Sequence, residues 1–136
     1  MPYIRQLRDA NFIWTTTLPA AGSSNSTPVI NLDAINGDAD PSLFDVNVDV
    51  PALPNHTDST KVITFTVQDS ADGSTFANVA PLIQCQVPGV ASTGSPETVF
   101  TFRLPPTVRQ YVQIVQAVPT GDGNNTASSP EVALLF

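Results

Sequence analysis

The chain has 136 residues, of which 12% are charged, and its 12 acidic and 5 basic side chains give a net charge of −7. This length fits one domain of roughly 100–200 residues, which can bury about two thirds of its unfolded surface. The basic residues form no cluster, which excludes nucleic-acid binding and a polybasic membrane contact, and no run of about 18 apolar residues is long enough to span a membrane.

Short stretches of alternating apolar and polar residues follow one another along the chain, and each ends at Pro, Gly, Asn, Asp or Ser. A period of two residues is that of a strand with one buried and one solvated face. We expect an N-terminal arm over residues 1–10, then strands over 11–17, 28–32, 43–50, 60–68, 76–79 leading into 82–87, 97–104, 109–118 and 131–136. About eight antiparallel strands predict an all-β, single-domain jelly roll or β-sandwich over residues 11–136.

Two strands show the alternation most clearly. In the stretch 61–68, Ile63, Phe65 and Val67 share one face. In the stretch 43–50, the pattern predicts a buried face of Phe44, Val46, Val48 and Val50 and a wet face of Asp45, Asn47 and Asp49. Between later strands, the dipeptide Asp72-Gly73 predicts a tight turn.

Residue types that perform catalysis are scarce. His56 is the only histidine, and its neighbours Asp58 and Ser59 are too close in sequence to form a catalytic triad with it, so we expect a solvated loop residue. The segment 121–123 (Gly-Asp-Gly) lacks the lysine and helix of a phosphate-binding loop and is interpreted as a turn. Cys85 falls on the apolar face of its strand, which predicts a buried free thiol.

Metal sites and carboxylate pairs have little support. One cysteine and one histidine on different elements cannot form a zinc site. One loop offers oxygen ligands that would suit calcium, but it lacks the EF-hand spacing and is more simply an Asx-rich turn. Its residues are Asp33, Asn36, Asp38 and Asp40.

The remaining carboxylates could suggest a glycosidase. Glu97 and Glu131 each begin a strand, whereas Asp45 and Asp49 share the wet face of one strand. A solvated face that discourages edge pairing explains the aspartates better than a glycosidase pair does. We therefore predict no catalytic residue, no cofactor and no metal, and no enzymatic activity.

Two aromatic residues offer flat faces with a polar tip, which could bind sugar. They are Trp14 and Tyr111, although Trp14 is expected to pack in the core with Phe12.

Three segments together resemble a known family. They are MPYIRQLRDANFIWTTTLPAAGSSNSTPVINLD at the start, TFTVQDSADGSTFANV in the centre and RLPPTVRQYVQIVQAV near the end. In this order, an arm, a strand with a DGSTF-type turn and a long strand after a Leu-Pro segment resemble the jelly-roll cement (decoration) proteins of tailed-bacteriophage capsids.

The resemblance implies a role in the virion. Such a protein is made in the host cytoplasm, binds the outside of an icosahedral shell of HK97-fold major capsid protein and clamps neighbouring capsomers. It also implies a homo-oligomer, with a dimer favoured, and no catalytic residues. The alternative is a carbohydrate- or receptor-binding β-sandwich module of a phage tail or surface protein.

The arm is the expected contact with the capsid. It combines apolar and aromatic side chains with the only local positive charge, and Tyr and Arg are frequent in the most strongly binding parts of interfaces. The residues expected to touch the shell or another partner are Tyr3, Ile4, Arg5, Leu7 and Arg8.

Overall fold

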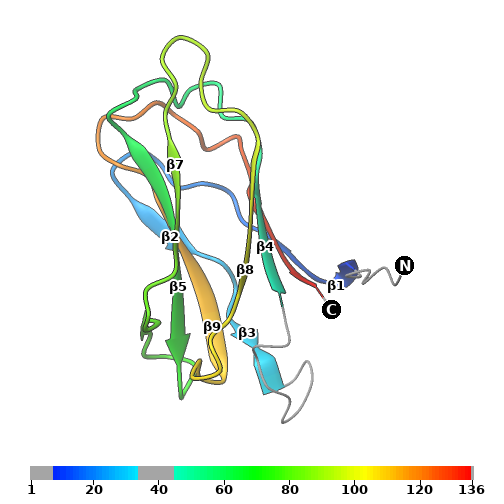
Figure 1. Ribbon diagram of the computed structural model, residues 1–136. Helices are drawn as coiled ribbons and strands as arrows, with labels where there is room; N and C mark the ends of the chain where they lie inside the picture. The colour runs from blue at the N-terminus through cyan, green and yellow to red at the C-terminus, as the bar shows by residue number, and fades with distance from the viewer. Residues whose placement is uncertain (1–7, 34–44, 136) are drawn as a thin grey trace.

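The protein is a sandwich of two antiparallel sheets (Figure 1). The structure, a computed structural model, describes residues 8–33 and 45–135, with side chains from residue 12 onward. Sheet A has the order β1-β10-β4-β8. Its strands are β1 (Arg8–Thr15), β10 (Glu131–Leu135), β4 (Asp45–Val50) and β8 (Thr98–Arg103).

Sheet B is built around its two long central strands, β5 (Val62–Ser70) and β9 (Tyr111–Ala117). Each outer edge consists of two short strands in succession. The strands β2 (Ser24–Ser26) and β3 (Ile30–Asn31) pair with successive parts of β9. In the same way, β6 (Ala77–Asn78) and β7 (Gln84–Pro88) pair with successive parts of β5.

Each pair of short strands occupies one position, so the ten strands within residues 8–33 and 45–135 fill eight positions, four in each sheet. With β1-β10-β4-β8 facing β2/β3-β9-β5-β6/β7, every sheet alternates strands from the two halves of the chain, which is the jelly-roll arrangement. The predicted all-β fold is therefore confirmed. The first strand begins at Arg8, within the expected arm, and β2 lies in a segment expected to be a loop.

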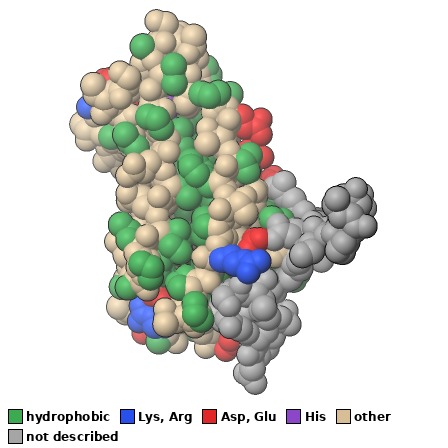
Figure 2. All heavy atoms as spheres, viewed as in Figure 1, with side chains coloured by type: hydrophobic (Ala, Val, Ile, Leu, Met, Phe, Trp, Pro, Cys, Tyr) green, Lys and Arg blue, Asp and Glu red, His purple; other side chains and the backbone are tan. Residues whose placement is uncertain are grey.

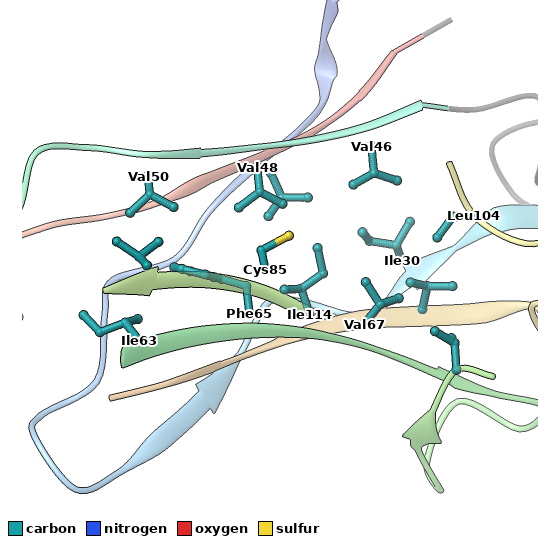
Figure 3. Close-up of a cluster of buried hydrophobic side chains, with 14 of the residues drawn as sticks. Ile30, Val46, Val48, Val50, Ile63, Phe65, Val67, Cys85, Leu104 and Ile114 are labelled. Atoms are coloured by element: carbon teal, nitrogen blue, oxygen red, sulfur yellow. The ribbon is translucent and has the colours of Figure 1, made fainter. Parts of the chain in front are cut away.

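The core lies between the sheets, as the alternation predicted. Val46, Val48 and Val50 point from β4 toward sheet B, and Ile63, Phe65 and Val67 of β5 point back toward sheet A (Figure 3). These six side chains are at most 3% exposed. Leu104 and Ile114 extend the same cluster, and Phe100 and Phe102 of the edge strand β8 pack against it half-buried. Figure 2, viewed from the same direction as Figure 1, shows hydrophobic side chains along the middle of the visible face.

Four connections meet at one end of the sandwich, which we call the loop end. They follow β1, β4, β7 and β9 and span residues 16–23, 51–61, 89–97 and 118–130. Backbone hydrogen bonds join them, among them Leu18 N to Ser128 O, Leu53 N to Ser95 O and Val90 N to His56 O. The connections β5–β6 and β8–β9 lie at the opposite end.

Candidate functional site

His56 and Asp122 form a fully buried pair at the centre of the loop end. The His56 Nδ1 and Asp122 Oδ2 atoms are 2.8 Å apart, and both side chains are 0% exposed. On the other side of the ring, Nε2 lies 2.8 Å from the carbonyl oxygen of Val87. The ring therefore lies between two acceptors, the Asp122 carboxylate on one side and the Val87 carbonyl on the other.

This pair corrects one interpretation. His56 is not a solvated loop residue, because its side chain is fully buried, whereas Asp122 lies in the expected turn and its backbone N–H donates to the carbonyl of Pro119. Asp58, the nearer neighbour in sequence, instead accepts hydrogen bonds from the hydroxyl and backbone N–H of Thr60, which lower the pKa of its carboxyl. The contact of Nε2 with a main-chain carbonyl, rather than with a hydroxyl, gives the ring no nucleophile to activate.

The outer face of sheet B carries a group of amide and hydroxyl side chains, most of them hydrogen-bonded to one another, which we call the amide face. It is formed by Thr64, Thr66, Gln68, Asn78, Gln84, Gln86 and Gln113. One row runs from Gln113 Nε2 to Gln68 Oε1 at 2.9 Å and from Gln68 Nε2 to Asn78 Oδ1 at 3.0 Å. A second row links Gln86 Nε2 to Gln84 Oε1 and Gln84 Nε2 to Thr66 Oγ1.

The two outer faces of the sandwich differ in charge. By strand register, no Asp, Glu, Lys or Arg of the described strands of sheet B lies on the amide face. The outer face of sheet A instead carries Asp45, Asp49, Arg103 and Glu131. Asp45 was expected in water, but its side chain is only 12% exposed, because the Nε of Arg103 donates a hydrogen bond of 2.7 Å to its Oδ1.

A second ion pair lies at the end opposite the loop end. Asp69, at the end of β5, accepts hydrogen bonds from the Nε, Nη2 and backbone N–H of Arg109, with Nη2 2.7 Å from Oδ1. Burial raises the pKa of Asp69, but the hydrogen bonds and charge of Arg109 outweigh it and hold the pKa below its ordinary value. The pair lines a hollow of about 400 Å³ between β6 and the β8–β9 connection.

Three of the carboxylates considered in the sequence come together. Asp49, Glu97 and Glu131 line an open hollow of about 230 Å³ on the sheet A side of the loop end. Glu131 and Asp49 are paired across β10 and β4. No three Cys, His, Asp or Glu side chains of the described ranges are arranged to hold a metal ion.

The remaining candidates are two aromatic residues, the cysteine and a void between the sheets. Trp14 packs against the core with Phe12, as expected, so it offers no sugar platform, whereas Tyr111 is half-buried on the outer side of β9. Cys85 is buried, as predicted, and burial raises the pKa of its thiol to about 11. A void of about 10 Å³ between the sheets has an apolar lining and is therefore dry, since a trapped water needs polar partners.

Two expected sites lie wholly or partly outside the described residues. In the arm, Tyr3, Ile4, Arg5 and Leu7 precede them, and Arg8 is described only as the first backbone position of β1. In the proposed calcium loop, Asp33 is described and exposed, whereas Asn36, Asp38 and Asp40 are not described.

Comparison with known proteins leaves the function to be argued from this geometry. No protein-family model matches the chain, and no curated protein matches it significantly. Within residues 8–33 and 45–135, no helix is long and apolar enough to cross a membrane.

Proposed function

We propose that this chain is a structural capsid cement protein. In this role it binds the outer surface of an icosahedral shell of HK97-fold major capsid protein and clamps neighbouring capsomers, as the family it resembles does. The observation that best supports the proposal is the amide face. The centres of protein interfaces are depleted in charged side chains, and this face is free of them although the protein has a net charge of −7.

The arrangement of the amide face suits a rigid contact. The side-chain amides of Gln68, Gln84 and Gln113 are held by their neighbours, so less rotamer freedom is lost when a partner covers them. Each held amide keeps hydrogen-bonding capacity for a partner, because a primary amide has two N–H groups and two carbonyl lone pairs. Bridging several shell subunits at once would strengthen modest individual contacts through effective concentration.

Co-sedimentation with expanded, undecorated capsids from the same source tests the proposal. Saturable binding at a fixed ratio to the shell subunit, measured by gel densitometry, supports a cement role. The absence of binding at micromolar concentration contradicts it. Sedimentation equilibrium of the free protein tests the expected dimer separately.

Charge insertion then tests which face binds. Gln113→Lys places a charge on the amide face, and we expect at least tenfold weaker binding because the lysine would be desolvated at the interface. Thr101→Lys places the same charge on the outer face of sheet A and serves as the matched control. Equal loss in both variants, or loss only in the control, excludes the amide face.

The arm needs a truncation that leaves the sheet intact. Since β1 begins at Arg8, deletion of residues 1–7 removes most of the predicted contact without shortening this strand. Loss of capsid binding in this truncation, with the unfolding midpoint unchanged, would place the principal contact in the arm.

A further inference from the structure

The hollow beside Asp69 and Arg109 combines an apolar wall with a polar rim. It lies between the end of β5, the strand β6 and the β8–β9 connection. Ala80, Pro105 and Val108 contribute apolar surface, and the polar groups come from Asn78, Thr107, Asp69 and Arg109. Its volume of about 400 Å³ lies at the small end of the range of ligand pockets, about 300–1,000 Å³.

The charges in the hollow are already compensated. The guanidinium of Arg109 donates to Asp69 through Nε and Nη2, and Nη2 also donates to the Asp69 carbonyl at 2.9 Å. An anion would have to compete with the Asp69 carboxylate for this guanidinium, and it would approach a protein with a net charge of −7. A cation would face the same competition from Arg109. An uncharged ligand meets neither penalty.

Donors and acceptors remain side by side on the polar rim. A carboxylate offers about four acceptor positions, and the described hydrogen bonds of the Asp69 side chain use three of them. The described hydrogen bonds of Arg109 leave Nη1 as a donor, and those of Asn78 leave Nδ2, since Asn78 accepts from Gln68 through Oδ1. Adjacent donors and acceptors match vicinal hydroxyl groups, each of which donates one hydrogen bond and accepts others.

We propose that this hollow is a binding site for a neutral sugar, of the size of a monosaccharide or a disaccharide. The C–H face of the sugar ring lies against Pro105 and Val108, and its hydroxyls bond to Asp69, Arg109 and Asn78. The site shares Asn78 with the amide face, and its other lining residues lie outside that face. Sugar binding is measured on the free chain, so it does not depend on binding to a capsid.

Chemical-shift titration of the uniformly ¹⁵N-labelled full chain tests the site. The probes are methyl β-galactopyranoside, methyl α-glucopyranoside, methyl α-mannopyranoside and N-acetylglucosamine. We expect at least one of them to shift the backbone amides of residues 78–80 and 107–109 saturably. The expected dissociation constant is about 1–10 mM, as for a small ligand with few contacts.

Two variants locate the binding. Thr107→Trp fills the hollow from an exposed position and should weaken binding at least tenfold, whereas Thr101→Trp, exposed on β8, should leave it unchanged. A spectrum with native-like dispersion verifies that each variant is folded.

Three results would overturn the proposal. One is that none of the four sugars shifts these amides at 100 mM. Another is equal binding by wild type and Thr107→Trp. The third is that sodium phosphate, but no sugar, shifts the same amides, which would assign the hollow to an anion instead.

Discussion

His56 and Asp122 have the residue types of a catalytic dyad but the surroundings of a structural clamp. The ring is enclosed, and its nitrogens face the Asp122 carboxylate of the loop end and the Val87 carbonyl of β7. Removing one member of a buried polar pair leaves the other group buried without its partner, which is more costly than losing an exposed pair. The pair therefore joins the connections 51–61 and 118–130 to each other and to the strand β7.

We expect His56→Ala to lower the free energy of unfolding by about 3–5 kcal/mol, because the Asp122 carboxylate and the Val87 carbonyl then lose their partner in a buried site. Asp122→Ala should have a similar effect, and the double variant should cost clearly less than the sum of the two. Urea unfolding of all four proteins measures this coupling. Additive losses would contradict the clamp, and Asp58→Ala, in the same loop but exposed, is the control.

The Asp69–Arg109 pair predicts how stability depends on pH. The pKa of Asp69 is lower in the folded protein than its ordinary value of about 3.9, so the pair stabilises the fold above that value. This stabilisation is lost as the pH falls through the folded-state pKa. Between pH 6 and pH 2.5, wild type should therefore lose more stability than Asp69→Asn.

Urea unfolding at several pH values measures how the free energy of unfolding of wild type and of Asp69→Asn changes with pH. Arg109→Gln removes the cause of the lowered pKa and should flatten the profile in the same way. Parallel profiles for wild type and both variants would mean that the pair does not contribute to the acid sensitivity.

At the scale of elements, the loop end requires glycine where backbones touch. Gly94 has a positive φ of 76°, and a Cβ there would overlap the carbonyl oxygen of Leu53. Gly73, in the predicted Asp72-Gly73 turn, also has a positive φ of 80°, but a Cβ there would meet only the ring of Tyr111 at 3.4 Å. The two glycines share the conformational requirement and differ in the space around them.

Substitution by alanine should separate these two effects. Gly73→Ala should destabilise the protein by about 1–2 kcal/mol, the cost of a left-handed conformation with a Cβ. Gly94→Ala should cost more, because the backbone of the β4–β5 connection must also move. Thermal unfolding of both variants measures the difference, and equal losses would show that the close approach at Gly94 relaxes freely.

The sequence could predict the strands whose alternation is local and regular. Val46, Val48, Ile63 and Val67 face the core as expected, because a period of two residues assigns each side chain to a face. The His56–Asp122 pair could not be predicted, since it joins two loops without any local pattern. Gln116 also escaped prediction, because it occupies an inward position of β9 and donates to the Thr17 carbonyl at 3.3 Å and to Asn25 Oδ1 at 2.9 Å.

The edges of sheet B were predicted in part. The strands β3 and β6 fall within the expected stretches 28–32 and 76–79, whereas β2, with three residues, lies where a loop was expected. They are strands because β9 and β5 provide the hydrogen-bonding partners. The two candidate surfaces, the amide face and the Asp69–Arg109 hollow, depend on this pairing, and neither follows from spacing along the chain.

For the whole molecule, the distribution of charge predicts how capsid binding responds to salt. Contacts made by an uncharged face should change little when the NaCl concentration rises from 50 to 500 mM, although the Debye length falls severalfold. Contacts made by the arm through Arg5 and Arg8 should weaken markedly over the same range. Co-sedimentation at both concentrations, with the full chain and with the chain lacking residues 1–7, distinguishes the two.

We expect less than about a twofold change for the full chain if the amide face dominates. A much larger change that disappears with residues 1–7 would place the main contact in the arm instead.

The pairing of β1 with β10 has a mechanical consequence. Arg8 lies opposite Leu135, so the described chain enters and leaves the sandwich at the same corner of sheet A (Figure 1). In an antiparallel pair the hydrogen bonds run perpendicular to the strands. Tension that pulls residues 8 and 135 apart would therefore break the hydrogen bonds between β1 and β10 one after another. A force spread over the faces of the sandwich would instead act on many bonds at once, so this fold resists load far better through its surfaces than through its ends.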